Sequence, residues 1–233
     1  MKINLPNSAR MLAPTYLHPG QFTRFDPDSD PVIASIESAR HAAFTAAEHI
    51  VAAARARAEN TMDTPVRNMA AARTYARRKL AETMPKLDAA RARGIAAIES
   101  LERVIATSLS EAALRWSFAD ATRQHVRGLP NGAARTDFVM DSLKGDARAA
   151  GAVIGAPAYL SGLSEAEHAM LAVAHRRGVF PAEAARIDKI TEAVDIIGRG
   201  GSLFLEAVHS MFDSAEIAAA AEKEQAALAA ERN

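Results

Sequence analysis

Residues 94–116 read GIAAIESLERVIATSLSEAALRW, and this stretch decides the fold class. Its apolar face recurs in steps of four, three, four, four, three and four residues, at Gly94, Ile98, Leu101, Ile105, Leu109, Ala112 and Trp116. This spacing is typical of one side of an α-helix, and its eleven-residue repeat favours a nearly straight helix. Because only Gly94 interrupts the chain between Pro85 and Arg127, the sequence predicts one helix of roughly 40 residues there, about 60 Å long.

Two helix starts precede this stretch. Asp30 and Thr64 each stand directly before a proline, so a capping side chain precedes a residue suited to the first helical position. They predict a helix from residue 31 to about residue 60 and a second from residue 65 to residue 84. Pro85 then marks a kink or a new start.

The first 30 residues differ from the rest of the chain. Their prolines block both helix and central strand, which predicts an extended arm. Tyr16, Phe22 and Phe25 lie in this arm, although disordered tails are usually poor in aromatic residues. Two interpretations stay open: the arm folds back onto its own chain, or it lies in a groove of a neighbouring subunit.

Shorter helices are predicted after a break at Gly128 to Gly132. Thr136 or Asp137 can cap a helix that ends near Ala150. Ser164 and Glu167 have the spacing of a capping box, and this helix closes at Gly178. A helix that begins at Pro181 is expected to end at the turn Gly198-Arg199-Gly200-Gly201, before a short helix and a last, acidic one.

The predicted fold class is all-α, because no alternating strand pattern of useful length occurs. We expect an extended arm over residues 1–30, a long-helix bundle over 31–128 and shorter helices over 129–233. The chain is rich in alanine and only 5% aromatic. Alanine buries little area, so such helices often need partners to cover their surface.

Composition excludes several classes of protein. The chain has no cysteine, which removes disulfides and thiolate chemistry, and its 28 basic side chains balance 28 acidic ones. No stretch is long and apolar enough for a bilayer, and the N-terminus does not resemble a secretory signal. We expect a cytoplasmic protein with no membrane contact and no cofactor.

Two Glu-x-x-His motifs come closest to catalytic chemistry: Glu165/His168 and Glu206/His209. Carboxylate-bridged di-iron bundles use two such motifs with two further glutamates. However, Met170, Leu171 and Val173 set the expected buried face of the first helix, and His168 points away from it. The motifs therefore predict solvated faces, and we assign no catalytic, cofactor-binding or metal-binding residue. A metal-dependent helical-bundle enzyme ranks third among the functions.

Charge is distributed unevenly along the neutral chain. Residues 55–93 carry ten basic and four acidic side chains, whereas residues 206–233 carry two basic and six acidic ones. Contact with nucleic acid or another acidic surface is the alternative function, with candidate residues Arg73, Arg77, Arg78 and Lys79. Only Tyr75 offers an aromatic platform in this segment, so compensation by the protein's own acidic side chains is favoured.

The segment GDARAAGAVIGAPAYLSGLSEAEH at residues 145–168 resembles part of small helical proteins encoded among the virion structural genes of tailed phages and prophages. The resemblance implies a virion-associated or assembly role and brings no catalytic residue. We therefore expect a non-enzymatic structural protein of a phage particle, which forms a homo-oligomer or larger assembly through residues 1–30 and 85–127. Aromatic side chains often dominate interface energies, and the candidate anchors are Tyr16, Phe22, Phe25 and Trp116. Trp116 can equally belong to the core.

Overall fold

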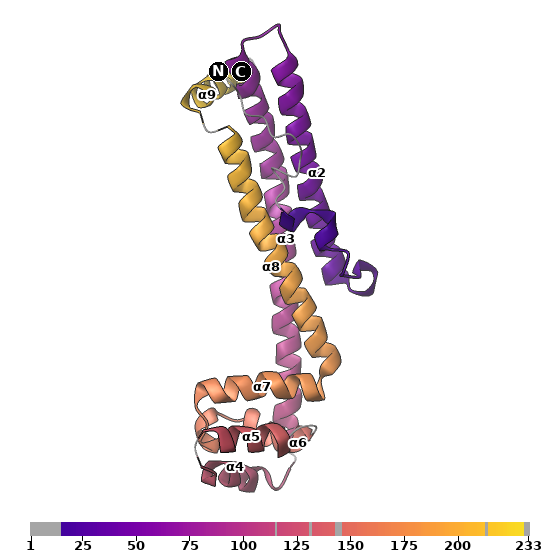
Figure 1. The fold of residues 1–233 in the computed structure, drawn as a ribbon, viewed down its shortest axis with the longest axis vertical. Helices are drawn as coiled ribbons and strands as arrows, with labels where there is room; N and C mark the ends of the chain where they lie inside the picture. The colour runs from indigo at the N-terminus through magenta and orange to yellow at the C-terminus, as the bar shows by residue number, and fades with distance from the viewer. Residues whose placement is uncertain (1–14, 115, 131, 143–145, 213, 231–233) are drawn as a thin grey trace. The chain divides into compact units, whose positions relative to one another are not determined.

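A computed structural model describes residues 15–114, 116–130, 132–142, 146–212 and 214–230. Helices and no strands occur in these ranges, which confirms the all-α prediction (Figure 1). Two long helices come first, several shorter ones follow, and another long helix stands near the end of the chain. The α-helices are α2 (Pro31–Glu59), α3 (Pro65–Leu114), α4 (Ala119–Gly128), α5 (Ala133–Ser142), α6 (Ala147–Ile154), α7 (Glu165–Val179), α8 (Pro181–Met211) and α9 (Ala215–Ala230). The 3₁₀ helices are η1 (Thr15–Leu17), η2 (Pro19–Gln21), η3 (Pro27–Ser29) and η4 (Ala158–Ser161).

The chain divides into two compact units. Unit 1 contains the described residues up to Ile95 and those from Ile190 onward, and unit 2 is Ala96–Lys189. Both boundaries fall inside long helices, α3 and α8. Each unit is described separately below.

Unit 1 is built on a close contact of α2, α3 and α8, which run side by side (Figure 1). A Cβ atom placed on Gly94 of α3 would lie 2.3 Å from Val194 Cγ2 and 3.6 Å from Ile190 Cγ2, both on α8. It would also lie 3.5 Å from Ile36 Cδ1 on α2. Gly94 is therefore a packing position, and the absence of a side chain lets three helices meet there.

Helix α3 passes through Pro85, where the sequence suggested a kink or a new start. Proline removes the backbone hydrogen bond to the carbonyl four residues earlier, which belongs to Ala81. Pro85 and Ala81 are both exposed, so water can reach this carbonyl. Thr83 and Leu87 are buried on either side of the proline. Tertiary packing therefore holds the helix continuous across a residue of low helix propensity.

The predicted helix over residues 85–127 is wrong at both ends, because α3 begins at Pro65 and ends at Leu114. The backbone turns after Trp116, whose carbonyl accepts a hydrogen bond from Ala119 N (3.2 Å) where α4 begins. The indole of Trp116 packs against the core of unit 2. The helix thus ends where this large side chain meets the unit 2 core, a tertiary contact that local periodicity does not reveal.

Helix α8 contradicts the helix end predicted at the glycine-rich turn, since it runs unbroken through residues 198–201. A Cβ atom on Gly200 would lie 2.7 Å from Leu17 Cδ2, and one on Gly201 would lie 3.3 Å from Leu87 Cδ1. These glycines let η1 and α3 approach the backbone of α8. Glycine weakens a helix by about 1 kcal/mol relative to alanine, which the surrounding contacts outweigh.

The part of the arm that the structure describes, residues 15–30, folds back onto its own chain. It forms η1 to η3, and Leu17, Phe22 and Phe25 are buried there. Of the two interpretations of the arm, the structure therefore shows the first for residues 15–30: they fold onto their own chain and do not need a neighbouring subunit to be buried. Residues 1–14 lie outside the described ranges.

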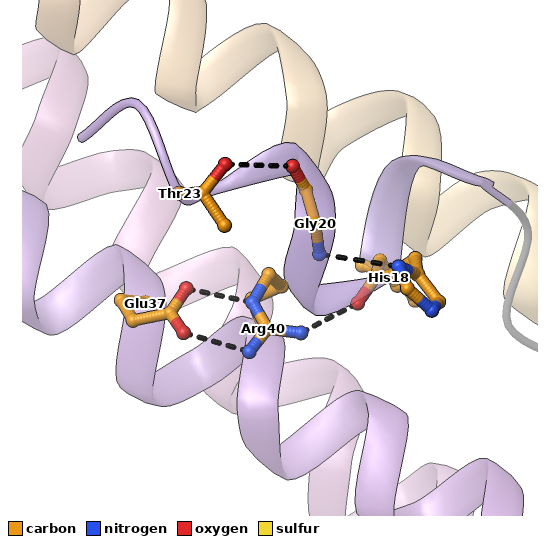
Figure 2. A network of polar contacts seen from close by, with 6 residues as sticks. His18, Gly20, Thr23, Glu37 and Arg40 are labelled. Atoms are coloured by element: carbon orange, nitrogen blue, oxygen red, sulfur yellow. Dashed lines mark hydrogen bonds and ion pairs between the residues drawn. The ribbon is translucent and has the colours of Figure 1, made fainter.

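A buried arginine on α2 fastens this segment to unit 1 (Figure 2). Arg40 is 2% exposed, and its Nε and Nη2 donate to the two carboxylate oxygens of Glu37 at 2.6 and 2.7 Å. Its Nη1 donates to the carbonyl of Leu17 at 2.6 Å. The guanidinium also lies 5.6 Å from the ring centroid of Phe22. The charge is therefore paired, hydrogen-bonded and placed over an aromatic face, and each of these contacts offsets the loss of water on burial.

Two apolar clusters lie among the described residues of unit 2. In the first, Ile105 and Leu109 of α3 meet Ile187 of α8, with Ile98 and Leu101 packed alongside, which confirms the predicted apolar face of α3 within these residues. The second cluster lies among α4 to α7 and contains Val126, Val139, Ala149, Ala150, Val153, Ile154, Ala158, Leu163 and Leu171.

A second buried arginine organises unit 2. Arg135 of α5 is 5% exposed and donates from Nη2 to the carbonyls of Arg127 (3.0 Å) and Leu129 (2.6 Å) at the end of α4. Its Nη1 donates to the carbonyl of Gly162, which ends η4. A cation at helix C-termini satisfies carbonyls that have no partner within the helix.

The predicted helix caps have mixed outcomes. Asp30 caps α2 by accepting from Val32 N at 2.8 Å, and Ser164 with Glu167 forms the predicted capping box of α7. The helix expected from Thr136 or Asp137 to Ala150 is wrong, because α5 ends at Ser142 and α6 begins at Ala147. Asp146 causes this second start, since its side chain caps α6 at Arg148 N and Ala149 N, 2.9 and 3.2 Å away.

Replacement of Gly94 or Gly200 by alanine is expected to destabilise the protein by about 1–3 kcal/mol, because each new Cβ atom overlaps a packed side chain. Alanine is the better helix former, so a purely local view predicts the opposite sign. Gly178→Ala in α7 is the control, since its Cβ atom would meet nothing within 4 Å. Urea unfolding followed by circular dichroism measures all three variants, and equal effects would contradict the packing argument.

Arg40→Met is expected to lower the free energy of unfolding by roughly 1–3 kcal/mol, because it leaves the Glu37 carboxylate and the Leu17 carbonyl without their donor. Hydrogen exchange should become faster over residues 15–29. Arg24→Met is the matched control, since Arg24 pairs with Glu192 at the surface and should contribute less than about 1 kcal/mol. Unchanged exchange in the Arg40 variant would show that this arginine does not hold the segment.

Candidate functional site

The four aromatic residues expected to anchor partners occupy different environments. Phe22 and Phe25 are 3% and 6% exposed, and their rings contact each other at a centroid distance of 5.0 Å. Tyr16 is half-buried and lines a cavity of unit 1 beside Arg91 and Asp195. Phe22 and Phe25 therefore stabilise the chain's own fold, whereas Tyr16 retains a partly open position.

Trp116 is partly buried against the core of unit 2. Its ring meets that of Phe118 edge-on at a centroid distance of 6.2 Å. Phe118 is 62% exposed and was not singled out from the sequence. An exposed phenylalanine supported by a partly buried tryptophan is a better candidate for contact with a partner than the tryptophan itself.

The basic segment is partly neutralised by nearby acidic groups. Lys79 Nζ lies 2.8 Å from a carboxylate oxygen of Glu82, and Arg78 Nε lies 3.9 Å from the other. These contacts lower the pKa of Glu82, chiefly through the hydrogen bond from Lys79. The cations of Arg78 and Lys79 also lie 5.3 and 5.9 Å from the ring centroid of Tyr75. The aromatic platform is therefore already occupied by the chain's own cations.

The remaining two candidates of this segment lie elsewhere. Arg73 and Arg77 line a groove of unit 1 between α3 and α8, with a cavity volume of about 450 Å³. The other lining residues are Ala76, Glu206, Val208, His209, Ser210 and Phe212. The structure thus separates the four predicted basic contacts into two pairs with different surroundings.

The two Glu-x-x-His motifs lie in different units, Glu165 and His168 in unit 2 and Glu206 and His209 in unit 1. Among the described residues, no group of three or more His, Asp or Glu side chains is placed to hold a metal ion. The Nε2 atom of His168 lies 3.1 Å from the carbonyl of Ala156, so this histidine has a local hydrogen-bond partner.

Helix α7 follows the sequence prediction only in part, because Leu171 is buried as expected but Met170 and Val173 are not. Its buried residues are Leu171 and His175, and His168 on the same side is half-buried. Met170 and Val173, which were expected to face the core, are 50% and 41% exposed. The physical reason is that His175 is buried and His168 is hydrogen-bonded on the inward side of α7, whereas hydrophobicity alone assigns both histidines to the surface.

The exposed side of α7 is consequently apolar. We call it the outer face of α7 and define it by four exposed residues that follow helical spacing: Ala166, Ala169, Met170 and Val173. Most of the exposed large apolar side chains in the described part of the chain also belong to unit 2, and these are Val104, Phe118, Met140, Tyr159, Leu160, Met170 and Val173. Unit 2 is therefore the stronger candidate for contact with other proteins.

No family model, curated protein or solved structure matches this chain. The candidate sites therefore rest on the geometry and chemistry of its own residues. In the described ranges, no helix has both the length and the apolar character needed to cross a membrane.

His175 is a buried histidine of unit 2. It is 8% exposed, and its Nε2 atom has no hydrogen-bond partner. Burial lowers the pKa of His175 below its ordinary value of 6.5, while the carboxylate of Asp146 acts in the opposite direction. The folded chain therefore favours the neutral imidazole.

Acidification is expected to destabilise the protein through His175. The unfolded chain takes up the proton near pH 6.5 and the folded chain only at lower pH, so stability falls as pH falls through that window. His175→Met should reduce the loss of unfolding free energy between about pH 7 and about pH 5. Urea unfolding at these pH values measures the difference, and the exposed His125→Gln serves as control. An unchanged pH dependence in the His175 variant would assign the acid sensitivity to other groups.

Proposed function

We propose that this chain is a non-enzymatic structural or assembly protein that acts through protein–protein contacts as a component of a tailed-phage particle. The observation that carries the proposal is the apolar outer face of α7. Its four residues leave an apolar strip on a helix whose opposite side is already buried in unit 2. A helix that is buried on one side and apolar on the other is suited to lie between its own core and a partner.

The chemistry of this strip favours another helix as the contacting element. Ala166 and Ala169 are small, so a second backbone can approach closely, while Met170 adapts its shape to irregular surfaces. Val173 extends the strip by one turn toward the end of α7. We take a second copy of the chain as the first partner to test, consistent with a homo-oligomer or larger assembly.

The phage assignment is supported by the place of the resembling segment. Residues 145–168 include α6, η4 and the first turn of α7, all in unit 2. Tyr159 and Leu160 of this segment are 68% and 39% exposed. The part of the chain that resembles proteins of phage structural gene clusters thus contributes apolar surface next in sequence to the outer face of α7.

Nucleic acid is the less favoured partner, because the basic segment is partly paired within the chain. Arg67 pairs with Asp63 at 3.4 Å, in addition to the contacts that Arg78 and Lys79 make with Glu82. Counterion release, which drives most nucleic-acid binding, needs cations that are free to meet phosphates. Salt-sensitive binding of DNA or RNA by the purified chain would reverse this preference.

The double change Met170→Glu with Val173→Glu is expected to dissociate the assembly, because it places two charges in a strip that must lose water on contact. Light scattering after size exclusion should show a wild-type oligomer and a smaller species for the variant, with circular dichroism unchanged. Met62→Glu is the matched control, since Met62 is 91% exposed outside unit 2.

A wild-type chain that stays monomeric at every accessible concentration would contradict self-assembly through α7. Mass spectrometry of phage particles from cells that carry the gene tests the second part of the proposal. Absence of the chain from such particles would contradict the virion assignment.

A further inference from the structure

The groove between α3 and α8 of unit 1 has an apolar floor and a polar rim. Ala76, Val208 and Phe212 are buried and form the floor. Four lining side chains are exposed at the rim: Arg77, Glu206, His209 and Ser210. Arg73 and Arg77 are one turn apart on α3, so both guanidinium groups lie on the same side of that helix.

Arg73 is the unusual member of this set. Its Nη1 atom is buried and has no hydrogen-bond partner. Arg40 shows how the same chain satisfies a buried guanidinium group elsewhere, because its Nε, Nη1 and Nη2 atoms all donate to a carboxylate or a carbonyl. A buried donor without an acceptor destabilises the fold, so the Arg73 side chain would gain a hydrogen bond by turning toward an acceptor in the groove.

We propose that this groove binds an oxyanion, a phosphate or a carboxylate group, through the guanidinium groups of Arg73 and Arg77. Arginine presents paired N–H donors that match the oxygens of either group. His209 and Ser210 offer further donors from α8. This site does not depend on the assembly role, because unit 1 carries it whether or not α7 meets a partner.

The charge of the groove agrees with this ligand. The lining contains two arginines and one acidic residue, Glu206, so its net charge is +1 with His209 counted as neutral. Within the described residues neither Arg73 nor Arg77 forms an ion pair with a carboxylate of the chain. By comparison, Arg67 on the same helix pairs with Asp63 and is 70% exposed.

The test compares thermal unfolding of the full chain in sodium phosphate, sodium acetate and sodium chloride at equal ionic strength, with isothermal titration calorimetry of phosphate. Phosphate is expected to raise the midpoint of unfolding above its value in chloride. Arg73→Met should remove this increase and weaken phosphate binding at least about tenfold. Its midpoint in chloride should stay unchanged or rise, because the unpartnered donor is gone.

Arg67→Gln is the control of equal charge change and should keep the response to phosphate. An increase with phosphate alone assigns a phosphate ligand, and an equal increase with acetate assigns a carboxylate, so both support the site. Three results would overturn it: no increase with either anion, an increase that persists in Arg73→Met, or an equal loss in Arg67→Gln. A lower midpoint of Arg73→Met in chloride would instead identify Arg73 as a structural residue.

Discussion

Unit 1 depends on the close approach of three helices at Gly94. Alanine buries little area, so an alanine-rich bundle gains stability only when its backbones lie near one another over a long distance. The buried positions of α2 show this composition, with Ala39, Ala43, Ala46, Ala47 and Ala54 among them. Glycine occupies positions in α3 and α8 where a methyl group would overlap a packed side chain, at Gly94 and Gly200, or would be tightly packed, at Gly201.

The sequence predicts the fold class and most helix starts because these depend on local chemistry. The caps at Asp30 and Ser164 are examples, since a side chain satisfies nearby backbone N–H groups whatever lies beyond. The ends of helices were less predictable. Residues 198–201 look like a turn, and only the contact of Gly200 with Leu17, far away in the sequence, shows why a helix contains them.

The candidate sites were only partly predictable for a related reason. Arg73 and Arg77 stand in the basic segment and were named, but periodicity could not separate them from Arg78 and Lys79, which Glu82 neutralises. The outer face of α7 was missed because hydrophobicity assigns Met170 and Val173 to the core. The decisive information is the burial of His175, a tertiary property that a single sequence does not contain.

Unit 2 is continuous in sequence, whereas unit 1 is assembled from residues on both sides of it. Synthesis proceeds from the N-terminus, so every residue of unit 2 has left the ribosome before Val194, which completes the contact at Gly94. Until then, α2 and the first half of α3 present an apolar surface that lacks its third helix. The nascent chain therefore passes through a stage in which unit 2 can fold while unit 1 still lacks its segment of α8.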